Sequence, residues 1–200
     1  MGSRYNRLGI FGGTFNPIHM GHLRLAEDVR EEFFLDMILF FPAARPPHKE
    51  MDVWVDPVHR LRMVEIATES NEHFICDPFE VERGGVSYTI DTVKYVYEKY
   101  NPETKPFLII GSDLIPGLGT WKSVDMLVKM VNFIVINRDG YPFEGMNKDI
   151  IMQSSYYLYS KRKIDITSSE IRERLKSRRS IRYLVTDEVF RYIIENELYT

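Results

Sequence analysis

The sequence has very little cysteine and no long apolar run. Cys76 is the one cysteine among 200 residues, so an intramolecular disulfide is excluded and an oxidising compartment is not required. No apolar run approaches the roughly 20 residues that a membrane-spanning helix needs. The first residues also lack the apolar stretch of a secretory signal. We therefore expect a cytoplasmic protein without a membrane partner.

Two common phosphate-binding motifs are also absent. The chain contains neither G-x-G-x-x-G nor a Gly-Lys-Ser/Thr sequence that would close a P-loop. What the chain does have is 44% hydrophobic residues, which is enough for one compact domain with a sizeable core. Neither of these two motifs can therefore form a phosphate site in this chain.

The net charge of −3 hides a basic segment. Between residues 160 and 182, nine basic side chains stand against three acidic ones, and the rest of the chain is clearly acidic. A local excess of positive charge on an acidic protein indicates a localised anionic ligand rather than general adhesion to nucleic acid. We expect no nucleic-acid partner, and a nucleic-acid interface on this stretch stays an alternative.

Short apolar runs alternate with longer amphipathic segments along the chain. Apolar strands separated by helices are typical of a parallel sheet that is covered on both faces, and parallel neighbours need right-handed crossovers. We therefore predict an α/β fold: a doubly wound, Rossmann-like parallel sheet of about five strands with helices on both faces. The predicted strands are 8–11, 37–41, 74–76, 107–110 and 133–136, and the predicted helices are 22–33, 56–68, 90–100, 124–129, 168–177 and 187–195.

No clear linker divides the chain. We therefore predict a single domain over residues 1–200, whose pattern after Tyr141 becomes mainly helical and whose last part, roughly 165–200, forms a small helical subdomain. In a doubly wound sheet, ligands bind beyond the carboxyl ends of the strands. The turns after residues 11, 41, 110 and 136 are therefore expected to line one crevice.

The first of these turns carries two glycines and two histidines. Gly12 and Gly13 let the backbone approach a ligand, and the helix that follows offers unpaired N–H groups to an anion. His19 and His22 are three residues apart, so both imidazoles can point at one group. The residues alone leave three interpretations open: packing or capping of the helix start, two ligands of a metal site, or a clamp on phosphate oxygens.

The whole segment, Gly-Gly-Thr-Phe-Asn-Pro-Ile-His-Met-Gly-His, resembles the signature of the nucleotidyltransferase superfamily that carries a His-x-Gly-His motif. The resemblance implies that His19 and His22 are catalytic, because in that superfamily the two histidines bind the ATP phosphates and stabilise the transition state. We assign further ATP contacts to the turn that precedes them, at Gly12, Gly13, Thr14 and Phe15.

A second segment, Ile-Thr-Ser-Ser-Glu-Ile-Arg at 166–172, completes the clamp. Thr167 and Glu170 have the spacing of a capping box, which predicts that a helix starts there. Arg172 then lies near the positive end of that helix, where a polyphosphate is a better counter-charge than solvent. The segment resembles the superfamily's second signature, Ile-Ser-Ser-Thr-x-x-Arg. This resemblance implies that Thr167, Ser168 and Arg172 hold the ATP phosphates, with Arg172 as the third catalytic residue.

Residues in the middle of the chain are expected to select the acceptor. A loop stiffened by prolines leads to His48 and Lys49, and Lys49 can reach an incoming phosphate. A glycine loop enters a helix near Thr89, where free N–H groups suit a carboxylate. Trp121 lies in another loop, where it either packs locally or stacks on an aromatic ring. Gly111 and Asp113 end the fourth predicted strand and are assigned to ATP, because a carboxylate there can bind ribose hydroxyls.

Together these segments resemble the bacterial nicotinate-nucleotide adenylyltransferase family almost from end to end. The resemblance implies that Trp121 stacks on the pyridine ring and that amides near Thr89 recognise its carboxylate, and Arg138 joins His48 and Lys49 on the mononucleotide side. One departure concerns loop shape: the sequence after Arg138 lacks a proline that the family often has.

The implied reaction joins nicotinate mononucleotide to the AMP part of ATP and releases pyrophosphate. Mg²⁺ is expected to bind through the ATP phosphates, without protein ligands. Alternatives are an adenylyltransferase for nicotinamide mononucleotide or phosphopantetheine, and a non-catalytic nucleotide-binding protein. The sequence leaves homo-oligomerisation open.

Overall fold

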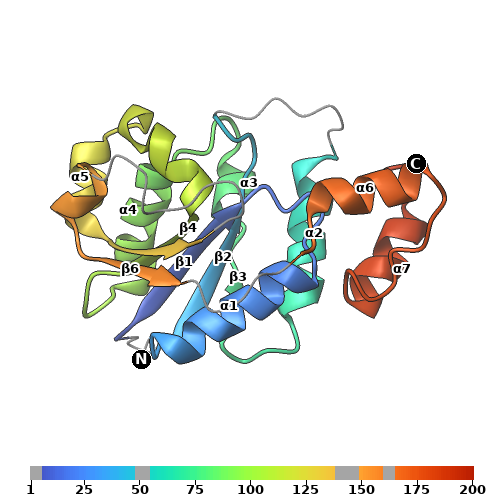
Figure 1. The fold of residues 1–200 in the computed structure, drawn as a ribbon, viewed down its shortest axis with the longest axis horizontal. Helices are drawn as coiled ribbons and strands as arrows, with labels where there is room; N and C mark the ends of the chain where they lie inside the picture. Colours follow the sequence, from blue (N-terminus) through green and yellow to red (C-terminus); the bar gives the residue numbers. More distant parts are fainter. Residues whose placement is uncertain (1–5, 48–54, 138–148, 160–164) are drawn as a thin grey trace.

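The computed structural model describes residues 6–47, 55–137, 149–159 and 165–200. Its strands form one parallel sheet in the order β3-β2-β1-β4-β5-β6 (Figure 1). The chain therefore builds the sheet outwards from β1, first to one side and then to the other, which confirms the predicted doubly wound, Rossmann-like fold. The strands are β1 (Leu8–Gly13), β2 (Met37–Pro42), β3 (Phe74–Cys76), β4 (Phe107–Gly111), β5 (Asn132–Ile136) and β6 (Tyr156–Tyr159).

Capping residues set the starts of several helices. The Asp56 side chain accepts a hydrogen bond from the N–H of Val58, and Thr186 accepts one from Val189. These two caps begin α2 and α7. The α-helices are α1 (Met20–Glu32), α2 (Pro57–Thr68), α3 (Phe79–Arg83), α4 (Thr89–Tyr100), α5 (Val124–Met130), α6 (Ser168–Lys176) and α7 (Asp187–Glu195), and two 3-10 helices are η1 (Ser112–Thr120) and η3 (Ile151–Gln153).

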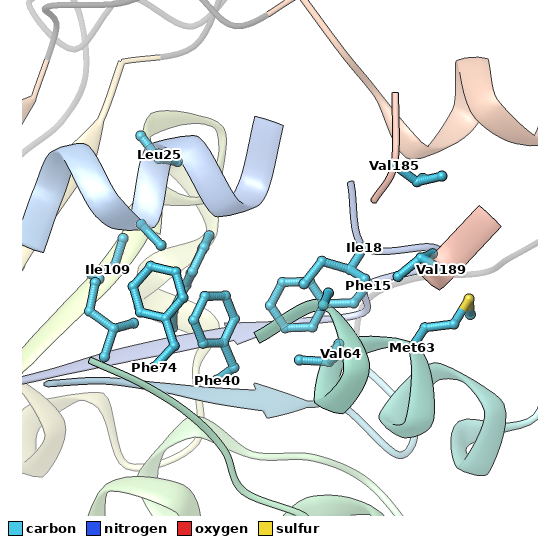
Figure 2. Packing of buried hydrophobic residues seen from close by; sticks show 14 of the residues in the cluster. Phe15, Ile18, Leu25, Phe40, Met63, Val64, Phe74, Ile109, Val185 and Val189 are labelled. Carbon is cyan, nitrogen blue, oxygen red and sulfur yellow. The ribbon is translucent and has the colours of Figure 1, made fainter. Parts of the chain in front are cut away.

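Two hydrophobic clusters cover the two faces of the sheet. Along β2, Ile38 and Phe40 belong to the cluster with α1 and α2, while Leu39 and Phe41 belong to the cluster with α4 and α5. All of β2 is buried, which explains why its sequence shows no polar alternation. Figure 2 shows part of the first cluster, where the rings of Phe40 and Phe74 lie 5.1 Å apart.

The C-terminal helices share this core. Val185 and Val189 belong to the same cluster as Ile18 and Met63 and lie near them in Figure 2. In Figure 1, α6 and α7 lie at the end of the molecule opposite α5. Within the described ranges, no helix has both the length and the apolar character that crossing a membrane requires.

The prediction of about five strands missed β6, whereas the two helices predicted after Tyr141 are present as α6 and α7. β6 pairs with β5, from Phe133↔Tyr156 to Ile136↔Tyr159, and is the edge strand of the sheet that the described residues form. Tyr157 and Leu158 are exposed there. The strand therefore lacks the continuous apolar run by which the buried strands were found, although three tyrosines in four residues favour a strand.

Candidate functional site

The candidate site lies at the switch in strand order. β1 pairs with β2 on one side and with β4 on the other, and all three strands are parallel. Their carboxyl ends, at Gly13, Pro42 and Gly111, therefore meet at one edge of the sheet. This is the edge at which ligands bind in doubly wound sheets. We call residues 12–19, which include the end of β1 and its connection to α1, the phosphate loop, after the ligand predicted for it.

Gly13 and Phe15 give the phosphate loop its shape. A Cβ atom at Gly13 would lie 2.9–3.1 Å from the ring of Phe15, so a larger residue would displace that ring. Phe15 has a φ of 46° and is 3% exposed. Its ring packs edge-on against Phe11 and against His22, with centroid separations of 5.7 and 5.1 Å. The Phe15 side chain thus supports the loop from the protein interior. An ATP contact at this position would have to come from the backbone.

The two predicted catalytic histidines stack on each other at the start of α1. Their ring centroids are 3.7 Å apart and the rings are inclined by 27°. His19 is the N-cap residue, and its N–H donates to Nδ1 of His22 at 3.3 Å. Because Nδ1 of His22 accepts this hydrogen bond, the proton of its neutral ring is on Nε2. His22 therefore both caps the helix and carries a donor of its own.

The second predicted segment docks directly on the phosphate loop. Thr167 caps α6 by accepting a hydrogen bond from the N–H of Glu170 at 3.1 Å. The Ser168 hydroxyl donates to the carbonyl of Pro17 at 2.9 Å. Arg172 donates through Nη1 to the carbonyl of Asn16 at 2.9 Å and through Nη2 to Ser169 at 3.1 Å. The two motifs, far apart in sequence, are therefore in contact.

Two residues that the sequence did not single out also bind the phosphate loop. Tyr199 donates from its hydroxyl to Oδ1 of Asn16 at 2.7 Å. Arg60 donates through Nη1 to the carbonyl of Thr14 at 2.7 Å. A signal for Arg60 existed, because it lies on the same helical stripe of α2 as the buried Met63 and Val64.

On the acceptor side, the structure brings the Trp121 loop to the start of α4. Lys122 pairs with Asp91 at 3.1 Å, and its ammonium lies 4.4 Å from the ring centroid of Tyr88. Thr89 is the first residue of α4 and lies between these two partners in sequence. Trp121 is half-buried against the cluster on the α4 and α5 face, so it is at least in part a packing anchor.

The remaining predicted site residues divide into two groups. Gly111 ends β4, and the half-buried Asp113 lies in the first turn of η1, at the same edge of the sheet as the phosphate loop. His48, Lys49 and Arg138 lie outside the described residues.

One buried carboxyl group lies beneath the acceptor side. Glu80 on α3 is 5% exposed and accepts a hydrogen bond from the hydroxyl of Thr92 at 2.5 Å. Burial raises the pKa of Glu80, although its hydrogen bonds with Thr92 and Ser87 oppose that shift. Burial also raises the pKa of the Cys76 thiol, in keeping with an inert, structural cysteine.

The doubly wound sheet, the two histidines at its switch point and the second helix docked on the same loop form the arrangement that the resemblance to the nucleotidyltransferases implied. The chain belongs to the cytidylyltransferase-like family, whose model matches residues 10–174. Within that family, the predicted likeness to the nicotinate-nucleotide adenylyltransferases is confirmed. The chain is 40% identical to a probable nicotinate-nucleotide adenylyltransferase of Thermoanaerobacter sp. (strain X514), over 96% of this chain and 94% of that protein. It is 38% identical to the nicotinate-nucleotide adenylyltransferase of Bacillus subtilis (strain 168), over 96% and 98%.

A solved structure shares the fold. The Plasmodium falciparum nicotinic acid mononucleotide adenylyltransferase complexed with NaAD superposes with a TM-score of 0.76, at 22% identity, over 97% of both chains. At this identity, the likeness concerns the fold alone.

Proposed function

We propose that this protein transfers the adenylyl group of ATP to nicotinate mononucleotide and releases pyrophosphate, as a step in NAD biosynthesis. The curated relatives that match nearly the whole chain support this proposal by their names. The observation that carries it is the contact between the two motifs: Ser168 and Arg172 of α6 bind the carbonyls of Pro17 and Asn16, next to the stacked histidines. Side chains from two distant segments thus come together at one loop.

Catalysis in this proposal consists of alignment and charge stabilisation. The attacking group is the phosphate of the mononucleotide, which is already anionic near neutral pH, so no strong protein base is needed. Nε2–H of His22 and the Arg172 guanidinium are donors for phosphate oxygens whose negative charge shifts during the reaction. Holding the acceptor phosphate in line with the α-phosphorus supplies the rest of the rate enhancement.

The residues of the site are compatible with Mg²⁺ that is carried by the ATP phosphates. Over the described ranges, no three His, Cys, Asp or Glu side chains gather in a group that could hold a metal ion. The phosphate loop and α6 offer imidazole, hydroxyl and guanidinium groups, which suit phosphate oxygens. When bound, Mg²⁺ would neutralise part of the phosphate charge. We therefore assign the metal to the nucleotide and not to a protein cage.

The basic segment is part of this site in the proposal and not a surface for nucleic acid. Arg172 binds the phosphate loop, Arg174 donates to the carbonyl of Ser180, and Arg182 stacks over Phe190. These intramolecular contacts support a structural use of the positive charge. The absence of nucleic-acid binding stays a prediction.

The test is a measurement of pyrophosphate release with ATP, Mg²⁺ and one acceptor at a time. We expect release with nicotinate mononucleotide and a clearly lower kcat/KM with nicotinamide mononucleotide, because the helix start near Thr89 suits a carboxylate better than an amide. Equal kcat/KM values would refute the assigned preference. No release with any pyridine mononucleotide would favour phosphopantetheine as acceptor or a non-catalytic nucleotide-binding protein.

A further inference from the structure

Arg60 is a charged side chain with no solvent exposure, and it is the largest fully buried side chain in the described part of the molecule. Its guanidinium uses a different nitrogen for each of three carbonyl groups. Nη1 donates to Thr14 at 2.7 Å, Nη2 donates to Ala44 at 2.9 Å, and Nε donates to Val55 at 3.1 Å. All three acceptors lie outside the helices and strands, so Arg60 is anchored in α2 and binds loops.

The first of these carbonyls belongs to the phosphate loop. Thr14 follows the Gly12-Gly13 turn and precedes Asn16, whose backbone carbonyl accepts from Arg172. Arg60 therefore holds the start of the segment that α6 holds at its end. A displacement of Arg60 would move the backbone on which both predicted ATP motifs converge.

The second carbonyl leads to the acceptor side. Ala44 follows β2, and its N–H donates to the Ser87 hydroxyl at 2.9 Å. Ser87 in turn donates its N–H to the carbonyl of Arg45 at 2.9 Å, and Arg45 forms a β-bridge with Val86. Residues 43–45 and 84–88 are thus joined to each other, and we call them the acceptor loops. Ser87 lies two positions before Thr89, the start of α4.

An arginine is an unfavourable choice if the position needs only to be filled. The neighbouring stripe of α2 is apolar, with Met63 and Val64 fully buried, so an apolar side chain of similar length would pack there. Burying a guanidinium requires its desolvation, which lowers the pKa of Arg60 from its ordinary value. A lysine carries its three donors on one nitrogen, whereas the planar guanidinium spreads its donors over three nitrogens, one for each of the three loop carbonyls.

We propose that Arg60 is a positioning residue that fixes the phosphate loop relative to the acceptor loops, so that the two substrates meet in line. This inference rests on the proposed adenylyl transfer. Arg60 touches neither substrate in this scheme, because it is enclosed beneath the loops. Its effect is on alignment: a displacement of about 1 Å between reacting groups can lower a rate about 10²-fold.

The experiment compares Arg60→Met and Arg60→Lys with a matched control, Thr68→Val. Thr68 is buried in the same helix, and its hydroxyl bonds the carbonyls of Val64 and Glu65, away from either loop. For each variant, kcat and KM for both substrates are measured, together with the Kd of ATP alone and the midpoint of thermal unfolding. Wild-type turnover with nicotinate mononucleotide is measured first, because its absence would refute the proposed function whatever the variants do.

For Arg60→Met we expect kcat to fall about 10²-fold while the Kd of ATP stays close to that of the wild type. Arg60→Lys keeps the charge, but its single nitrogen cannot reach all three carbonyls. Its kcat should therefore lie between that of the wild type and that of Arg60→Met. Thr68→Val should lower the unfolding temperature with kcat unchanged. If Arg60→Met does not fold, the same comparison of kcat, Kd and unfolding temperature is made with Arg60→Lys alone. The inference is overturned if the Arg60 variants behave like Thr68→Val, with a lower unfolding temperature and an unchanged kcat, or if the loss is confined to ATP binding.

Discussion

At the scale of single residues, the geometry of His22 is compatible with two of the roles that the sequence left open as alternatives. Its Nδ1 accepts the N–H of His19, which is a capping contact, and this bond leaves the proton on Nε2. The cap thereby fixes the tautomer that a phosphate donor needs. Capping and the predicted phosphate binding therefore do not exclude each other at His22, because the capping hydrogen bond orients the ring and leaves Nε2–H as a donor.

The role of His22 can be tested by removing its ring. We expect His22→Ala to lower kcat by about 10²-fold or more, the loss typical of removing one preorganised donor. The matched control is His73→Ala, because His73 directly precedes β3 and so lies at the opposite edge of the parallel sheet from the site. Steady-state pyrophosphate release measures both. Near-normal kcat in His22→Ala would remove this histidine from the mechanism.

Other residues of the site could not be found from local sequence. The spacing of Thr167 and Glu170 predicts a helix start, because a capping box is a local pattern. The structure has the cap of Thr167. Arg60 and Tyr199 bind the phosphate loop from positions 46 and 183 residues away from their partners. Such contacts depend on how helices pack, which no short pattern encodes. For Arg60, the one local indication in the sequence is a charged residue on an otherwise apolar stripe of α2.

At the scale of elements, the buried strands were the most predictable part of the fold. β1, β2 and β4 are apolar throughout because both faces of the sheet are covered, and their starts coincide with the predicted ones. β6 was missed because an edge strand can expose side chains. η1, with Pro116 inside it, was missed because 3-10 turns carry little periodic signal.

Helix α6 can be tested as an element that presents Arg172 to the phosphate loop. We expect Arg172→Lys to lower kcat/KM for ATP by about tenfold or more, because a lysine keeps the charge but loses the fork that binds Asn16 and Ser169 together. Arg174→Lys is the matched control on the same helix, since Arg174 binds Ser180 instead. Equal effects of the two substitutions would contradict a special role for the Arg172 fork at the phosphate loop.

At the scale of the whole molecule, the topology explains how distant segments form one site. Building the sheet outwards from β1 leaves the phosphate loop at the centre of its carboxyl edge. The chain then returns to this loop with α6 and again with Tyr199, so residues from nearly the whole length meet there. Stability and activity are therefore expected to be coupled, because the contacts that close the fold also shape the loop.

Global stability should depend on pH through Glu80. Burial raises the pKa of this carboxyl group above its ordinary 4.5, so the folded protein keeps the proton at pH values where the unfolded chain has lost it. Stability from this group is therefore complete below pH 4.5 and is lost as pH rises towards the folded pKa. The side chain in Glu80→Gln is neutral at every pH. The unfolding temperature of this variant, compared with that of the wild type, should therefore rise as pH increases. The shift is about 2–4 °C for each 1 kcal/mol of difference in the free energy of unfolding. Glu82→Gln, exposed on the same helix, controls for loss of one charge. A difference that stays constant or shrinks as pH rises would mean that Glu80 is charged in the fold.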